Sequence, residues 1–214
     1  MKRNRTQSAA VSVCRNEGPG STDRGNGVRD GTREEQQAML GRAATGDAAA
    51  FEVIVREHQS MVFSLACYFL HDPGRAEEIA QEAFLRLYQN LSRIESPEHL
   101  VQWLRQVTWR CAIDESRRAA HQPSVALEDV AEPAAEDHPV DLLVNDRLQA
   151  LVASLPPRAR MMVILRFQED LSLSEIAEVM KVPVNTVKSG LSRALSVLRE
   201  KLTRVLGESE YETV

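Results

Sequence analysis

SLSEIAEVMKVPVNTVKSGLSRA, residues 172–194, is the stretch that decides the fold of this chain. Ser172 followed three residues later by Glu175 is the pattern of a capping box, in which the hydroxyl accepts one backbone N–H and the carboxylate accepts another. Val182-Pro183 ends this helix, and proline fits the first turn of the next one. We therefore predict a short helix, a tight turn, and a second helix that begins at Pro183 or Val184.

The second predicted helix separates apolar from polar side chains. Val187, Leu191, Leu195 and Leu198 recur at helical spacing and are expected to face inward. In a helix-turn-helix, the other side of such a helix enters the DNA major groove. That side carries Lys188, Ser189, Ser192 and Arg193. A solvated face on an ordinary helical hairpin is the alternative interpretation, because short motifs also match by chance.

Charge is sorted along the chain. The 214 residues carry a formal net charge of −5, which argues against a simple basic nucleic-acid binder. Residues 181–204 nevertheless hold six basic residues and one acid, whereas residues 121–140 hold five acids and no lysine or arginine. A basic helix and an acidic connector thus cancel in the total.

Helical periodicity dominates the long segments, and none shows sustained alternation, so the predicted fold is all-α. We expect two small helical bundles joined by a flexible acidic linker, with the helix-turn-helix in the second. The predicted order is a disordered tail (1–35), a first helical domain (36–119), the linker (120–140), a second helical domain (141–206) and a C-terminal tail (207–214).

Composition also bears on compartment and chemistry. The chain has no apolar run of membrane-spanning length, and its N-terminus lacks the apolar core of a signal peptide, so we expect a cytoplasmic protein. Cys14, Cys67 and Cys111 are far apart, which fits a reducing compartment, and the last two are expected in the core. The five histidines show no metal-ligand spacing, and no phosphate loop or nucleophile motif occurs. An enzyme therefore finds little support, and we expect no cofactor and no metal.

Several segments match one family. The second bundle contains LPPR (155–158), LRF (165–167), EIA (175–177) and TVKS (186–189), and the first contains AEE (76–78), QEAFLRL (81–87) and WL (103–104). These residues resemble conserved regions four and two of bacterial RNA polymerase sigma factors, in the extracytoplasmic-function (ECF) branch of the sigma-70 family. The resemblance covers about residues 45–206. It implies a factor that binds core RNA polymerase, directs it to promoters and assists promoter melting, with promoter DNA as a partner in duplex and melted form. Members of this branch are commonly held by an anti-sigma factor.

The resemblance also implies roles for individual residues. Docking on the polymerase clamp would fall to Glu78, Gln81, Glu82 and Arg86. Capture of the melted minus-ten element would fall to Arg105, Trp109, Arg110, Arg117 and Arg118, whereas Trp103 is expected in the core. Contact with the minus-thirty-five element would fall to Asn185, Thr186, Lys188, Ser189, Ser192 and Arg193. Asn185 and Thr186 lie near a helix N-terminus, which suits phosphate.

Three positions depart from the family pattern. Many relatives have Asn where this chain has Arg110, and Arg where it has Trp109. Because arginine has no carbonyl acceptor, the minus-ten bases are expected to be read differently. Gly190 replaces a common Arg, which removes a cation and costs the helix up to about 1 kcal/mol of propensity.

The acidic linker has its own implied role. In this family the linker threads the active-centre cleft and the RNA exit path of the polymerase, where five carboxylates would mimic nucleic acid until RNA displaces them. A merely soluble spacer is the alternative.

A second function class stays open at this point. A free-standing helix-turn-helix regulator would bind duplex DNA as a dimer and without polymerase. That interpretation leaves the first bundle without a role, and a pull-down with core polymerase distinguishes the two.

Overall fold

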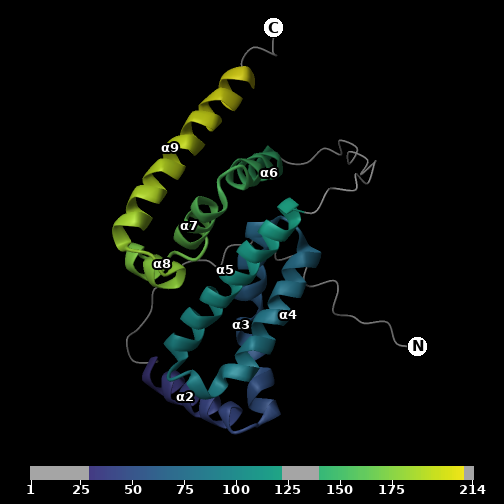
Figure 1. Cartoon of the computed structure of the whole chain (residues 1–214), viewed down its shortest axis with the longest axis vertical. Helices are drawn as coiled ribbons and strands as arrows, with labels where there is room; N and C mark the ends of the chain where they lie inside the picture. The colour runs from purple at the N-terminus through teal and green to yellow at the C-terminus, as the bar shows by residue number, and fades with distance from the viewer. Residues whose placement is uncertain (1–28, 122–139, 210–214) are drawn as a thin grey trace, which may run out of the picture. The chain divides into compact units, whose positions relative to one another are not determined.

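The computed structural model describes residues 29–121 and 140–209, and every regular element within these ranges is a helix (Figure 1). The all-α prediction is confirmed. Contacts between Cα atoms divide the chain into two compact units, Met1–Ala112 and Ile113–Val214. Most of the predicted N-terminal tail, nearly all of the acidic linker and the end of the C-terminal tail lie outside the described residues. The predicted domain boundaries stay predictions.

The first unit is a helical bundle in which the long helix α3 (Ala48–Leu70) packs on two of its neighbours. Its elements are α2 (Arg29–Ala44), α3 (Ala48–Leu70), α4 (Pro73–Asn90), the 3-10 helix η1 (Leu91–Arg93) and α5 (Pro97–His121), the last of which continues across the division between the units. α3 packs mainly on α4, and α2 packs on α3. The core is fully buried at Val62, Leu65 and Phe69 of α3, Leu87 of α4 and Leu104 of α5. Both cysteines expected in the core, Cys67 and Cys111, are buried.

α2 begins at Arg29, within the stretch that the sequence assigned to the N-terminal tail (1–35). Residues 29–37 contain no apolar side chain, so hydrophobic periodicity gives no signal there.

Local contacts build the turn between α3 and α4. His71 adopts a left-handed backbone conformation (φ 56°), and its N–H donates to the Cys67 carbonyl at 2.8 Å. Asp72 then caps α4 by accepting the Arg75 N–H at 3.1 Å, and Pro73 occupies the first helical position. These contacts join residues close in sequence and involve residue types that favour helix starts, so this helix start can be recognised from the sequence alone.

In its described residues the second unit holds the end of α5, followed by α6 (Val140–Ala153), α7 (Pro157–Phe167), α8 (Leu173–Met180) and α9 (Val184–Ser209). α7 and α8 both pack on α9. Ser172 caps α8 as predicted: its hydroxyl accepts the Glu175 N–H at 3.3 Å, and its own N–H donates to Glu175 Oε2 at 2.8 Å. The capping box is complete.

Replacing Ser172 with Ala is expected to lower the free energy of unfolding by about 1 kcal/mol, because the N–H at the start of α8 loses its acceptor. Urea titration of the full chain, followed by circular dichroism, measures this loss. Ser196→Ala, at an exposed position inside α9, is the matched control and should cause no loss. Equal losses in the two variants would contradict the role of the cap.

Candidate nucleic-acid interface

A tight turn fixes the direction in which α9 leaves α8. Lys181 ends α8 in a left-handed conformation (φ 54°), and its N–H donates to the Ala177 carbonyl. The Val182 N–H donates to the same carbonyl at 3.0 Å. α9 then begins at Val184, as predicted, and buries Val187. The opposite face of its first turns therefore points outward.

The inward face of α9 ends sooner than the sequence suggested. Leu195 was expected to face inward, and this expectation is wrong: the side chain is 37% exposed, whereas Ala194 is 3% exposed. Val197 and Leu202 are also exposed. Beyond Ala194, α9 has less of α7 and α8 to pack against, so apolar spacing no longer reports burial.

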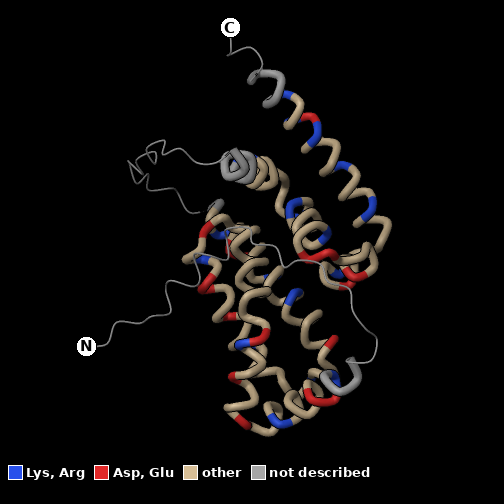
Figure 2. Tube along the Cα trace, turned by 180° about the vertical axis from the view of Figure 1, so that it is seen from behind, with Lys and Arg blue, Asp and Glu red and all other residues tan. Residues whose placement is uncertain are grey.

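The N-terminal part of α9 presents a polar surface. Ser189 Oγ donates to the Thr186 carbonyl at 3.2 Å, and Arg193 Nε donates to the Ser189 carbonyl at 3.2 Å. These bonds hold the two side chains against the helix backbone. Figure 2 shows that further Lys and Arg positions occur along α9. All six candidate minus-thirty-five residues are exposed: Asn185, Thr186, Lys188, Ser189, Ser192 and Arg193. The surface offers cations, hydroxyls and an amide, which are the groups that contact phosphates and base edges.

Two cations further along α9 are engaged within the second unit. Lys201 Nζ donates to Ser154 Oγ at 2.6 Å, and Arg204 lies 3.4 Å from Glu200. The basic character of residues 181–204 is therefore only in part directed at an external partner.

α4 carries the candidate clamp-binding residues on its outer side. Glu78, Gln81 and Arg86 are exposed, and Glu82 is half-buried with its carboxylate 2.7 Å from Arg86 Nε. The sequence reading missed Leu85, which is 54% exposed. It follows Gln81 by four residues and Glu82 by three, so it lies among them on the helix surface.

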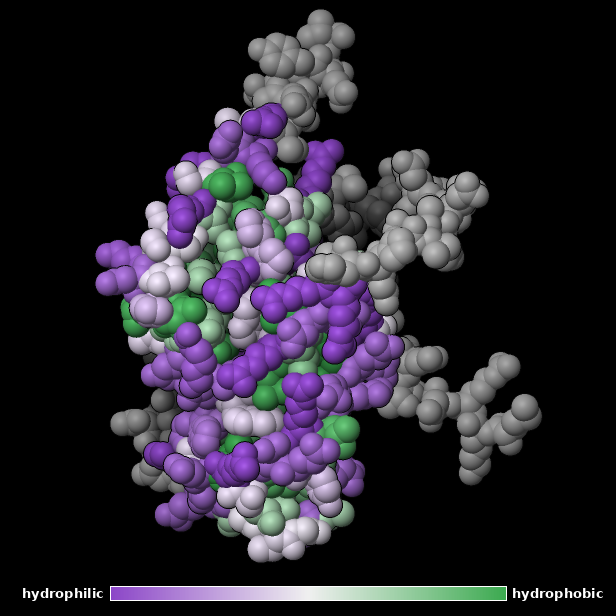
Figure 3. All heavy atoms as spheres, viewed as in Figure 1, coloured by the Kyte–Doolittle hydropathy of each residue, from purple (hydrophilic) through white to green (hydrophobic). Residues whose placement is uncertain are grey.

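Tyr88 is a second exposed apolar side chain on α4, at 56%. One edge of its ring packs on Phe51, with ring centroids 5.2 Å apart. In Figure 3 hydrophilic side chains dominate the visible face, and hydrophobic ones form small patches. Leu85 and Tyr88 are three residues apart, so they lie next to each other on the surface of α4.

The candidate minus-ten residues lie on α5. Arg110, Arg117 and Arg118 are exposed, and Arg105 is half-buried. Arg117 lies 3.7 Å from Asp114, and Arg118 lies 3.6 Å from Glu115. Such surface ion pairs are weak, so phosphates can replace the carboxylates at little cost.

The two tryptophans of α5 differ from expectation in how deeply each is buried. Trp109 was predicted to offer a stacking surface for DNA bases, but it is 7% exposed and packs edge-on against Phe69, with ring centroids 5.9 Å apart. Trp103, expected in the core, is half-buried. Both expectations are wrong, because α5 is covered on more than one side near Trp109 and a single periodic stripe does not describe its burial. Trp109 leaves the candidate set.

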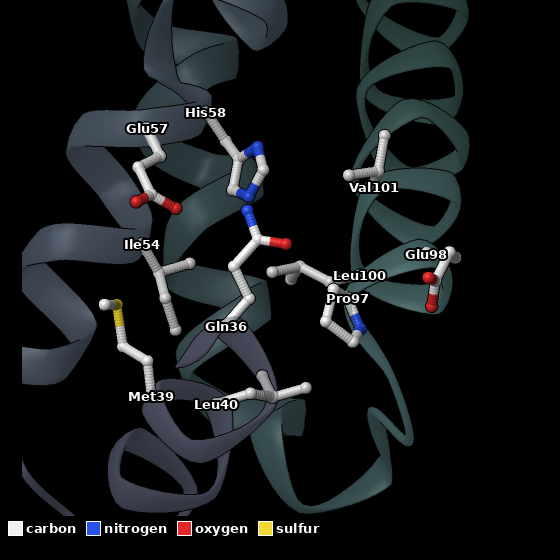
Figure 4. Close-up of a pocket in the computed structure, with 10 residues that line it drawn as sticks. All are labelled: Gln36, Met39, Leu40, Ile54, Glu57, His58, Pro97, Glu98, Leu100 and Val101. Atoms are coloured by element: carbon white, nitrogen blue, oxygen red, sulfur yellow. The ribbon is translucent and has the colours of Figure 1, made fainter. Parts of the chain in front are cut away.

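A cavity of about 170 Å³ lies between α2, α3 and α5, with His58 pointing into it (Figure 4). Burial lowers the pKa of His58, Glu57 opposes this, and Arg105 lowers it further. The imidazole is therefore mainly neutral near pH 7. Because no Lys or Arg lines the cavity, it is not suited to phosphate or nucleic acid.

Neither a metal site nor a membrane span is found in the described part of the chain. No group of three His, Cys, Asp or Glu side chains there could hold a metal ion. No helix among the described residues is both long and apolar enough to cross a bilayer.

The arrangement of α8 and α9 is that of a DNA-binding protein of the helix-turn-helix class. Residues 54–122 match the family described as Sigma-70 region 2, and residues 145–198 match Sigma-70, region 4. The chain is 31% identical to the RNA polymerase sigma-H factor of Pseudomonas aeruginosa over 192 residues, which cover 83% of this chain and 99% of that protein. It is 30% identical to the ECF RNA polymerase sigma factor SigW of Bacillus subtilis over 174 residues, 73% of this chain and 91% of SigW.

Two solved structures share the fold. One is CnrH in complex with the cytosolic domain of CnrY, with a TM-score of 0.61 and 18% identity over 79% of this chain and 97% of that chain. The other is the sigma factor RpoE of Bartonella quintana in complex with the anti-sigma factor NepR, with a TM-score of 0.57 and 20% identity over 72% of this chain and 96% of that chain.

The chain belongs to the sigma-70 family of RNA polymerase sigma factors, in its ECF branch. It serves promoter-specific initiation of transcription with RNA polymerase, and proteins of this family act as initiation factors.

Replacing Trp109 with Ala is expected to lower the free energy of unfolding by about 3–5 kcal/mol, because it removes a large buried ring and leaves a cavity against Phe69. Trp103→Ala removes the same side chain from a half-buried site and should cost clearly less. Urea titrations of both variants make the comparison. A larger loss for Trp103→Ala would contradict the assignment of Trp109 to the core.

Proposed function

We propose that the two units read a promoter at two points. The N-terminal part of α9 contacts the minus-thirty-five element in the major groove, through Asn185, Thr186, Lys188, Ser189, Ser192 and Arg193. α5 holds the melted minus-ten strand through Arg105, Arg110, Arg117 and Arg118. α4 docks on the polymerase clamp through Glu78, Gln81, Glu82 and Arg86.

One observation carries the minus-thirty-five assignment. All six of its residues are exposed at the start of a helix whose other face is buried at Val187, directly after a capped helix and a tight turn. A recognition helix needs this combination, because it must be held rigidly while its outer face stays available.

The minus-ten assignment is supported by charge. Arg110, Arg117 and Arg118 are exposed along one long helix, and single-stranded DNA is held by a positively charged surface. With Trp109 in the core, this surface relies more on charge than the sequence suggested.

Further features of the proposal concern partners and compartment. CnrH and the Bartonella RpoE were solved as complexes with the cytosolic domain of CnrY and with the anti-sigma factor NepR, which supports an inhibitory protein partner for this chain as well. We also propose that the protein works in the cytoplasm and catalyses no reaction of its own.

Arg193→Ala tests the minus-thirty-five assignment. The variant holoenzyme is expected to bind a promoter duplex about 5- to 150-fold more weakly, because an arginine that contacts a base or phosphate is worth about 1–3 kcal/mol. Fluorescence anisotropy with a labelled promoter, and with the same duplex scrambled at minus thirty-five, measures the effect.

Arg199→Ala is the matched control, since Arg199 is exposed on the same helix but lies six residues further from its start. It should change binding by less than about twofold. If Arg193→Ala bound as tightly as the unchanged protein, the assignment would fail.

Leu85→Ser tests the clamp surface. Leu85 is largely exposed, so its loss should leave folding intact, but affinity for core polymerase is expected to fall about fivefold or more if it is packed at the interface. Titration of core polymerase with labelled protein measures this. Leu202→Ser, a comparably exposed leucine on α9, should bind core as the unchanged protein does. Equal affinities for all three proteins would remove Leu85 from the interface.

A further inference from the structure

Gly190 lies among the six residues of α9 proposed to contact the minus-thirty-five element, but it is less exposed than they are. It sits between Ser189 and Ser192 in the sequence and is half-buried. A Cβ atom built on Gly190 would lie 2.6 Å from Sδ of Met162 and 3.3 Å from its Cε. Non-bonded carbon and sulfur atoms do not approach to 2.6 Å, since the optimum is about 3.5–4 Å. Met162, on α7, is 4% exposed, so either its flexible thioether end or α9 itself must move before a side chain fits at position 190.

Gly41 gives a contrast within the same chain. It also lies inside a helix, α2, but a Cβ atom there would meet nothing within 4 Å. Glycine inside a helix lowers stability relative to alanine, because the unfolded chain has more freedom to lose. A Cβ atom at position 41 therefore has open space, whereas a Cβ atom at position 190 displaces either Met162 or α9.

The contact between Met162 and Gly190 borders the proposed DNA-reading surface. A groove of about 350 Å³ lies between α7 and α9, and Met162, Gly190, Thr186 and Arg193 all contribute to its wall. Thr186 precedes Gly190 by four residues and Arg193 follows it by three, so all three lie on one side of α9. A change at this contact therefore reaches two residues proposed to touch the minus-thirty-five element.

We propose that the packing of Met162 on Gly190 sets the position of α9 against α7, which makes Gly190 a positioning residue for the choice of minus-thirty-five sequence. This rests on the proposed reading of that element by α9. A side chain at position 190 can be accommodated in two ways. Either α9 moves away from α7 and carries its outer face with it, or the thioether turns into the groove against Thr186 and Arg193. Both changes alter the surface that α9 presents to the bases, although none of the proposed contact residues is substituted.

The test compares base preference among four folded holoenzymes: the unchanged protein, Gly190→Ala, Gly41→Ala, and Gly190→Ala combined with Met162→Val. Valine ends at Cγ and lacks the atoms that meet the added Cβ. Run-off transcription from a promoter set with each minus-thirty-five base substituted in turn gives ratios of activity, and these ratios do not depend on how much protein is folded. We expect Gly190→Ala to change at least one ratio about fivefold or more, which corresponds to about 1 kcal/mol. Gly41→Ala should leave all ratios unchanged, and the double variant should return them to within about twofold of the original.

Each other outcome overturns the proposal. Unchanged ratios in folded Gly190→Ala would show that position 190 does not position the helix. Changed ratios that Met162→Val does not restore would show that Met162 is not the cause. Should Gly190→Ala fail to fold, Met162→Val alone, which empties the contact without a clash, must change the ratios, and unchanged ratios there overturn the proposal. If the unchanged protein itself shows no minus-thirty-five preference, the proposed function fails first, and that result is distinguishable from the others.

Discussion

The packing of α9 on α7 and α8 is the interaction on which the proposed reading of DNA depends. Leu165, Ile176 and Val187, one from each helix, are all fully buried. α8 has only eight residues, fewer than an isolated helix needs to be stable in water. It therefore exists because Ser172 caps it and because the neighbouring helices cover it. Since protein interiors are close-packed, α9 cannot shift without disturbing these contacts.

The same reasoning explains why α5 is a rigid carrier of charge in the first unit. Trp109 packs against Phe69 at the level where α5 is most enclosed, and Arg110 follows directly on its exposed side. The cations are therefore presented by an anchored helix rather than by a loop. Trp103 is the more exposed of the two tryptophans of α5, although it is still half-buried.

The sequence was a good guide where structure is decided within one helical turn. The capping box at Ser172 and the break at Pro183 both formed as predicted, because each depends on neighbours a few residues away. Trp109, Leu195 and Leu85 were misjudged or missed, since their exposure depends on which other helix covers them, and periodicity within one helix cannot report that. Gly190 combines both cases. The missing cation is visible in the sequence, whereas the approach of Met162 appears only once α7 and α9 are packed together.

The charge on α9 favours binding to DNA together with core polymerase over binding to DNA by this protein alone. Lys188 and Arg193 are the cations among the six proposed contacts, and neutralising two phosphates gives a salt slope of only about −1.8, against about −5 to −9 for proteins that contact six to ten. The net charge of −5 adds long-range repulsion. A free-standing regulator with this surface would therefore bind weakly at physiological salt. The same surface is sufficient when core polymerase binds the protein and holds α9 near the promoter, because tethering turns a weak contact into an intramolecular one at high effective concentration.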